Sequence, residues 1–264
     1  MELFGYFASA LIGISLGLIG GGGSILTVPV LVYLFKIDPV ESTAYSLFIV
    51  GLTSLIGSYS KYKEKLLDIK TALIFGAPSI AAVYLTRKFL VPEIPTEILH
   101  IGSFVLTKNL MLMLLFAILM VFASISMIKD QKKNASKNLS DSKYKYLIIL
   151  VEGFLVGTLT GLVGAGGGFL IIPALVLLTG LPMKEAVGTS LFIIAIKSLI
   201  GFTGDLGHFE MNWNLLTIVS AIAVAGIFLG NYLSKRIDGN KLKKGFGWFV
   251  LVMGAYIIIK ELFI

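Results

Sequence analysis

The chain has 264 residues, of which 56% are hydrophobic and 14% are charged, and its mean hydropathy is +0.93. An ordinary soluble domain is about 25% charged, so this composition indicates an integral membrane protein without a separate soluble domain. The chain has no cysteine, which excludes disulfides, cysteine–zinc sites and thiol catalysis. The net charge of +7 comes from Lys and Arg in loops, which is typical of topology signals and not of a nucleic-acid surface.

Eight apolar segments follow one another, four on each side of a hydrophilic stretch. The sequence predicts membrane helices within residues 3–35, 40–60, 69–91, 104–128, 146–179, 183–204, 213–234 and 246–263. The hydrophilic stretch (KDQKKNASKNLSDSKYK) holds six lysines and is interpreted as a solvated linker. We therefore expect an all-α polytopic membrane protein with an N-terminal repeat over 1–128, a basic linker over 129–145 and a C-terminal repeat over 146–264.

Each half opens with a copy of the same sequence. Residues 17–57 align without a gap with residues 161–201, and 19 of the 41 positions are identical. The shared core reads GLIGGGGSILTVPVLVYL in the first copy and GLVGAGGGFLIIPALVLL in the second. In both copies a glycine cluster interrupts a long apolar segment. Two such interruptions at corresponding positions of two halves indicate the binding site of a transporter.

The first and fifth segments are too long for one membrane crossing. As one helix, residues 3–35 would span roughly 50 Å, against a hydrocarbon core of roughly 30 Å. We expect the glycines at 20–23 and 164–168 to break each segment into a longer helix and a half-helix that turns back as a re-entrant hairpin. With such hairpins 16 Lys and Arg residues lie on one side of the membrane and 5 on the other, whereas simple crossings give 11 and 10. The positive-inside rule favours the hairpins, which predicts two inverted repeats, both termini outside and a cytoplasmic linker.

The glycine clusters are the candidate site. Irregular backbone survives in a membrane only where protein or a water-filled cavity surrounds it, and the free N–H groups at a helix start bind anions. Two such starts that approach the midplane from opposite sides suit a small anion. The alternative is that the glycines only permit tight helix packing. The candidate residues at the breaks are Gly22, Gly23, Ser24, Gly166, Gly167 and Gly168.

Lys197 is the most informative single residue, because it lies near the middle of an otherwise apolar helix. A lysine there costs about 2.5–3.5 kcal/mol on insertion scales, so it is a functional hypothesis by default. Its repeat mate is Thr53, and the alternative role is snorkelling towards the helix end at Asp205. Hydroxyls that could donate either to an anion or to a neighbouring helix are those of Thr43, Ser46, Thr189 and Ser190.

Other features are assigned to packing, capping or solvent. Glu41 and its mate Glu185 indicate helix caps, with coupling-ion binding as the alternative. A polar loop without a cation (Asp205, His208, Glu210) is interpreted as solvated, with proton relay as the alternative. Small residues spaced by four predict close approach of helices, namely Ser9, Gly13, Gly17, Gly153, Gly157, Gly161, Gly226 and Gly230.

At the glycine clusters the chain resembles the sulfite exporter TauE/SafE family. The resemblance rests on GLIGGGGSILTVP, GLVGAGGGFLIIPAL and AVGTSLFIIAIKSLIGF, and it extends through both halves. It implies a secondary transporter for sulfur-containing anions such as sulfite, sulfonates or related organic acids. Ala44-Tyr45-Ser46 stands in the first copy where the second has Gly188-Thr189-Ser190, so the two half-sites need not be equivalent.

We therefore expect a multi-pass protein of the cell membrane that exports a small anion by alternating access and is not an enzyme. No nucleotide-binding motif is present, so any transport is expected to be secondary. No cofactor is expected, and no nucleic-acid partner, because the basic residues lie in loops; coupling to a proton or another ion and the oligomeric state stay open. The alternatives are a passive anion channel and a membrane assembly subunit without transport. An intramembrane enzyme is disfavoured because no clustered nucleophile, base or metal set appears.

Overall fold

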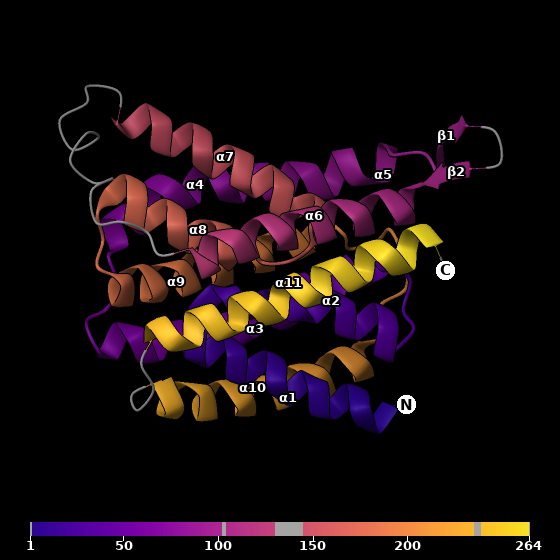
Figure 1. The fold of residues 1–264 in the computed structure, drawn as a ribbon. Coiled ribbons are helices and arrows are strands. Elements are labelled where there is room, and N and C mark those ends of the chain that lie inside the picture. Colours follow the sequence, from indigo (N-terminus) through magenta and orange to yellow (C-terminus); the bar gives the residue numbers. More distant parts are fainter. Residues whose placement is uncertain (1, 102–103, 130–144, 235–238, 264) are drawn as a thin grey trace.

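The computed structural model describes residues 2–101, 104–129, 145–234 and 239–263, and most of the predicted linker lies outside these residues. The described chain is a bundle of helices whose axes run mostly along one direction (Figure 1). The first half contains α1 (Glu2–Ile19), η1 (Gly20–Leu26), α2 (Thr27–Pro29), η2 (Val30–Leu34), α3 (Pro39–Lys63), α4 (Ile69–Leu85), η3 (Thr86–Leu90), α5 (Val91–Glu93), β1 (Glu97–Ile101), β2 (Phe104–Thr107) and α6 (Lys108–Ile128). The second half contains α7 (Lys145–Val163), α8 (Gly168–Ala174), η5 (Leu175–Thr179), α9 (Met183–Thr203), α10 (Trp213–Ser234) and α11 (Gly239–Phe263).

Helices long and apolar enough to cross a membrane make up most of the bundle. The described chain contains six of them, Pro39–Lys63, Ile69–Glu93, Lys108–Ile128, Met183–Thr203, Trp213–Ser234 and Lys244–Phe263. The apolar helices of the two broken segments are shorter and run over Leu3–Ile19, Gly23–Leu34 and Leu147–Val163. The prediction of a helical, multi-pass membrane protein is therefore confirmed.

Side-chain caps explain where several of these helices begin. The Asp38 carboxylate accepts a hydrogen bond from the backbone N–H of Val40 at 2.9 Å, with Pro39 as the first helical residue of α3. Asp68 caps α4 in the same way. The corresponding cap of α9 is not formed by a side chain, because Pro182 occupies the N-cap position and Glu185 lies in the first turn. The predicted N-cap of α3 is therefore confirmed, a capping role of Glu41 stays a prediction, and no side-chain cap forms beside Glu185.

Residues near the two ends of the first broken segment are in contact. The rings of Tyr6 and Phe35, which lie near its two ends, meet edge to face with their centroids 5.4 Å apart. A Cβ added at Gly5 would lie 2.6 Å from the Phe35 ring. Because the two ends of the segment are neighbours, α3 begins at the end of the bundle from which α1 started.

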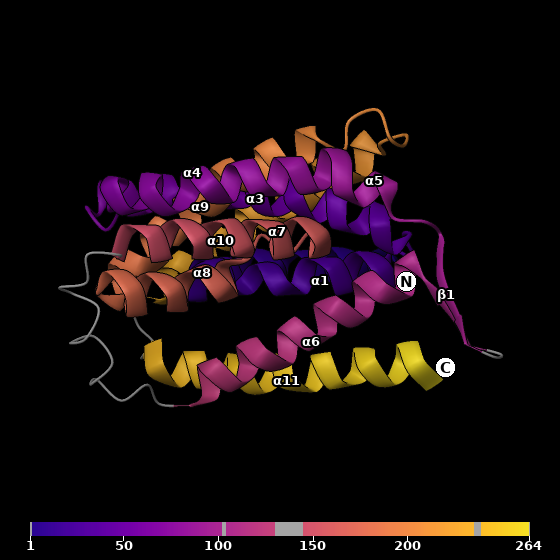
Figure 2. The same cartoon turned by 90° about the horizontal axis from the view of Figure 1, so that it is seen from above.

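The main helix–helix contacts join the two halves. Helix α1 packs along α10, and its repeat mate α7 packs along α4. Helix α3 packs on its own mate α9, and α6 on its own mate α11. Each helix therefore has the same kind of neighbour as its repeat mate. Both ends of the chain lie at one end of the bundle, called here the termini end, and the helix ends that flank the linker lie at the other, called the linker end (Figures 1 and 2).

The predicted small-residue contacts are confirmed at the α1–α10 and α4–α7 interfaces. A Cβ added at Gly13 would lie 1.9 Å from the backbone oxygen of Ala223, and one at Gly226 would lie 2.5 Å from that of Ala10. On the other side of the molecule a Cβ at Gly157 would lie 2.5 Å from the Ser79 oxygen. The backbones touch at these positions, so glycine is required there.

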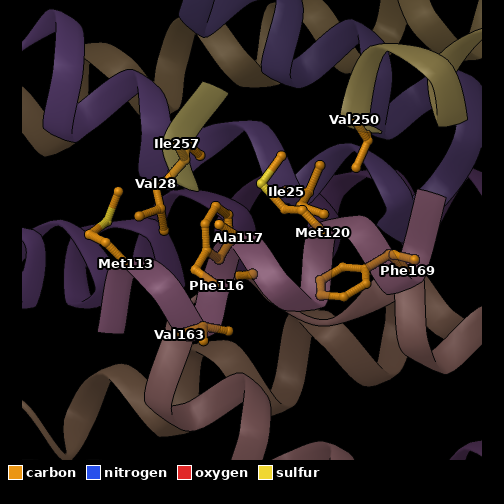
Figure 3. Close-up of a cluster of buried hydrophobic side chains, with 12 residues drawn as sticks. Ile25, Val28, Met113, Phe116, Ala117, Met120, Val163, Phe169, Val250 and Ile257 are labelled. Atoms are coloured by element: carbon orange, nitrogen blue, oxygen red, sulfur yellow. The ribbon is translucent and has the colours of Figure 1, made fainter. Parts of the chain in front are cut away.

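Helices α6 and α11 cover both glycine breaks with apolar side chains (Figures 2 and 3). One buried cluster joins side chains from the two breaks, among them Ile25 and Phe169, with α6 side chains such as Phe116 and α11 side chains such as Ile257. This packing closes the two breaks off from the surrounding lipid on that side.

One part of the predicted helical architecture is wrong. We expected an apolar helix over 104–128, but Phe104–Thr107 pairs antiparallel with Glu97–Ile101 as a β-hairpin at the termini end, and α6 begins only at Lys108. Gly102-Ser103 between two apolar runs is a hairpin signal in the sequence. The continuous apolar run from 104 onwards hid it.

Candidate functional site

The two glycine breaks meet in the middle of the bundle. A Cβ added at Gly168 would lie 2.1 Å from the Gly21 Cα, and one added at Gly21 would lie 2.5 Å from the Gly168 Cα. The two backbones are therefore in direct contact. Ser24 also faces the second break, because its Cβ lies 3.2 Å from a Cβ added at Gly166. The two breaks therefore meet, and their approach from opposite sides of the membrane stays a prediction.

The second break is a true interruption of the helix. Gly164, Gly166 and Gly167 have φ angles of +67°, +64° and +77°, which glycine adopts without strain. Helix α8 then begins at Gly168, and the Gly167 carbonyl accepts the backbone N–H groups of Leu170 and Ile171 at 3.0 and 2.9 Å. A new helix start therefore lies where the sequence predicted it.

The first break has a different shape. We expected a half-helix to begin near Gly22, Gly23 and Ser24, but residues 20–26 wind as a 3₁₀ helix directly after α1. The Ser24 hydroxyl donates to the Gly21 carbonyl at 2.7 Å, within this winding. Gly23 lies against Ser15 of α1, whose Oγ would be 2.5 Å from an added Cβ. The Ser24 hydroxyl is thus bonded within the first break.

Lys197 places its ammonium group at the second break. Its side chain is fully buried, and Nζ donates a hydrogen bond to the Thr160 hydroxyl at 2.8 Å. Nζ would lie 2.8 Å from a Cβ added at Gly167. The alternative of snorkelling towards Asp205 is wrong, because the ammonium points to the break and reaches no solvent. Sequence reasoning selected Lys197 but missed Thr160.

The first break has no such cation. Thr53, the repeat mate of Lys197, donates its hydroxyl to the Ile49 carbonyl of its own helix at 2.7 Å. Among the described residues, no carboxylate lies within ion-pair distance of the Lys197 ammonium. Of these two repeat mates, only the one at the second break therefore carries a basic group.

The predicted hydroxyls are all fully buried, but they have different environments. The Ser46 Oγ has no hydrogen-bond partner among the described residues. The Ser190 hydroxyl donates to the Val187 carbonyl at 2.9 Å. The Thr189 Oγ1 accepts the backbone N–H of Asp68 at 3.0 Å, at the start of α4. Anion binding by these three residues stays a prediction, and Thr189 has a structural partner.

A second buried cation was missed by the sequence reasoning. Arg87 is fully buried, and its Nε donates to the two Asp205 carboxylate oxygens at 2.9 and 2.8 Å. Its Nη2 lies 2.7 Å from Oδ1 of the same carboxylate. Burial raises the pKa of the Asp205 carboxyl, and the Arg87 guanidinium acts against that shift. The prediction that Asp205 belongs to a solvated, cation-free loop is therefore wrong.

A comparison with known families decides the broad class. The family model described as sulfite exporter TauE/SafE matches residues 6–257, which is nearly the whole chain. The chain belongs to the sulfite exporter TauE/SafE family. A "Probable membrane transporter protein" of Xylella fastidiosa (strain Temecula1) is 27% identical over 258 residues, which cover 95% of this chain and 92% of that protein.

Further relatives of this TauE/SafE chain carry similar names. The "Probable membrane transporter protein YunE" of Bacillus subtilis is 28% identical over 92% of this chain and 89% of its own length. The "Sulfite exporter TauE/SafE family protein 6" of Arabidopsis thaliana is 32% identical over 50% of this chain and 31% of its own length. No solved structure matches the chain significantly. Together, the family and the names support a multi-pass membrane transporter.

Proposed function

We propose that this chain is a secondary transporter that exports a small anion, such as sulfite, a sulfonate or a related organic acid, by alternating access. The observation that carries the proposal is the Lys197 ammonium, buried at the second glycine break with the neutral Thr160 hydroxyl as its partner. A buried ammonium costs free energy unless an opposite charge compensates it. A bound anion supplies that charge, and the backbone N–H groups at the start of α8 add hydrogen-bond donors beside it.

The closed arrangement of the site fits a transporter that alternates between two sides. Ser24, Ser46 and Lys197 are fully buried, and the backbones of Gly21 and Gly168 touch. An anion therefore reaches Lys197 only when the two halves move apart. Rocking of one repeat against the other around a site at the repeat interface provides such a movement.

We further propose that the two repeats are inverted in the cell membrane, with both termini outside and the basic linker in the cytoplasm. The exchange of helix partners between the halves supports this arrangement. So do the opposite ends at which α1 and α7 begin (Figure 1). The contact between the Tyr6 and Phe35 rings supports the proposal that the first broken segment is re-entrant, because the segment returns to the end of the bundle where it starts.

Uptake of labelled sulfite and of methanesulfonate into proteoliposomes tests the transport proposal. Lys197→Met keeps the length of the side chain and removes the charge, so we expect folded protein without anion transport. Lys184→Met on the same helix is the matched control, because Lys184 is exposed and lies in the first turn of α9. Full transport by the Lys197→Met protein would show that Lys197 does not bind the transported anion.

The same vesicles separate the alternatives. A flux that responds to a pH gradient, or to a gradient of another ion, supports a coupled transporter. An anion conductance that no second gradient changes supports a passive channel instead. No flux from folded wild-type protein with either anion supports an assembly subunit without transport.

Single cysteines test the orientation, because the wild-type chain contains none. We expect a membrane-impermeant thiol reagent to label Leu206→Cys on intact cells, since Leu206 is 47% exposed in the loop after α9. Lys129→Cys, at the linker end, is expected to react only after permeabilisation. The reverse pattern would invert the proposed topology.

A further inference from the structure

A buried ion pair joins the two repeats near the termini end of the bundle. Arg87 follows α4 in the first repeat, and Asp205 follows α9 in the second, 118 positions later in the chain. The Arg87 Nη1 also donates to the Thr43 hydroxyl at 2.8 Å and to the Gly161 carbonyl at 3.2 Å. The guanidinium is therefore held by three neighbours and fully shielded from solvent.

Arg87 and Lys197 contact adjacent residues of the same helical turn. Nζ of Lys197 bonds to Thr160, and Nη1 of Arg87 bonds to Gly161, just before the second break. Two buried cations thus flank the last turn of α7. The Lys197 ammonium has no carboxylate partner among the described residues, while Arg87 has one.

The carboxylate partner sits on a connection and not on a helix. Asp205 lies in residues 204–212, which join α9 to α10, and the next residue, Leu206, is 47% exposed. The carboxylate engages Arg87 as a free carboxylate or sulfonate ion would, because these groups present two oxygens to the planar guanidinium. A movement of this short connection would leave Arg87 without its charge partner.

The pair is not a requirement of the repeat architecture. The repeat mates of Arg87 and Asp205, 144 positions away, are Asn231 and Lys61. Lys61 forms its ion pair with Glu64 of its own segment, at 3.1 Å. The Asn231 Oδ1 has no hydrogen-bond partner among the described residues. Because Asn231 carries no charge, these two repeat mates cannot form an ion pair like that of Arg87 and Asp205.

We propose that Arg87 is a second anion-binding residue of the pathway, and that Asp205 occupies it in the closed state as a tethered anion that the transported anion replaces. This inference rests on the proposed function. In the exchange no covalent bond changes. The Asp205 carboxylate leaves the guanidinium for water as the connection moves, and the anion takes its place before it passes to Lys197.

Thermal unfolding of Asp205→Asn in detergent tests the exchange without any transport assay. This variant leaves the Arg87 charge buried without an anion, so we expect a lower melting temperature that methanesulfonate restores with increasing concentration. Sodium chloride at matched ionic strength controls for salt, and wild-type protein is expected to respond less. The double variant Arg87→Gln/Asp205→Asn is expected to lose the methanesulfonate response. A lower melting temperature that methanesulfonate does not restore would overturn the proposal and leave a purely structural pair.

A second variant keeps the test decisive if Asp205→Asn does not fold. Arg87→Lys keeps the charge and loses the bidentate donor geometry of the guanidinium. We therefore expect the anion concentration for half-maximal uptake to rise roughly tenfold, with the maximal rate retained. Lys88→Gln is the control, because Lys88 is exposed beside Arg87. A change in maximal rate alone would contradict anion binding at Arg87. The outcomes stay distinguishable from a failure of the transport proposal, because the unfolding experiment reports on Arg87 whether or not anions are transported.

Discussion

The two glycine breaks come from the same repeated sequence and touch each other, yet they differ in structure and in charge. The second has three glycines with positive φ, a fresh helix start and the Lys197 ammonium. The first has one such glycine, Gly20, winds on from there as a 3₁₀ helix and has Thr53 at the position of the lysine. The copies share the glycines ahead of the breaks, such as Gly17 and Gly161, which let neighbouring helices touch. They differ at the break contact and at the cation, because Gly168 and Lys197 have Ser24 and Thr53 as repeat mates. Symmetry therefore accounts for the scaffold, and the departures from it locate the candidate anion site.

The largest effect is expected from breaking the contact between the two breaks. In Gly168→Val the added Cβ would overlap the Gly21 backbone, which has no flexible side chain to move away. Overpacking of this kind costs about 1–3 kcal/mol or more, and here it also separates the two half-sites. We expect little folded protein by size-exclusion chromatography and no transport.

Gly245→Val is the control for that substitution. Gly245 also lies in a helix, α11, but a Cβ added there meets nothing within 4 Å. We expect folded protein that transports anions normally. Equal damage from both substitutions would mean that valine in a helix, and not the contact of the breaks, causes the loss.

A smaller effect is expected from the hydroxyl that holds the lysine. Thr160→Val removes the acceptor of the Lys197 hydrogen bond, so the buried ammonium loses its partner at a cost of about 1–3 kcal/mol. We expect a lower melting temperature and a change in the anion concentration that gives half-maximal uptake. Thr158→Val, on an exposed part of the same helix, is expected to change neither. Wild-type values in Thr160→Val would separate Thr160 from the site.

The smallest effect tests a predicted binding residue that has a structural contact. Thr189→Val removes the hydroxyl that accepts the Asp68 N–H, which we expect to cost about 1 kcal/mol of stability without changing the half-saturation for the anion. Unfolding and uptake measured on the same preparation decide between the two roles. A tenfold higher anion concentration for half-maximal uptake, at unchanged stability, would instead show that Thr189 binds the anion.

The repeat made much of the fold predictable. The glycine spacing before each break predicted that helices approach closely there, though not which helices, and the length of each broken segment predicted its interruption. The choice of Lys197 followed from one physical cost, that of a charge in an apolar helix. These features depend on residues close in sequence or on the comparison of two copies, both of which a single sequence contains.

The ion pair of Arg87 and Asp205 could not be predicted in that way. The partners lie 118 positions apart, and their repeat mates, Lys61 and Asn231, are not a pair of opposite charges that would indicate the pairing. Arg87 does lie inside a predicted apolar segment, which is the same signal that selected Lys197. Treating it as a loop residue in the charge count hid that signal. The 3₁₀ winding of the first break depends on contacts with α1 and also lies beyond local sequence patterns.

The most direct test of the account moves the cation from one break to the other. Anion uptake is measured for Lys197→Thr and for the double variant Thr53→Lys/Lys197→Thr, which places the lysine at the symmetric position of the first repeat. We predict no uptake by the single variant and partial recovery by the double variant, because the same charge again lies beside a glycine break. Uptake by the single variant at the wild-type rate would contradict the claim that one buried cation at the paired breaks defines the anion site.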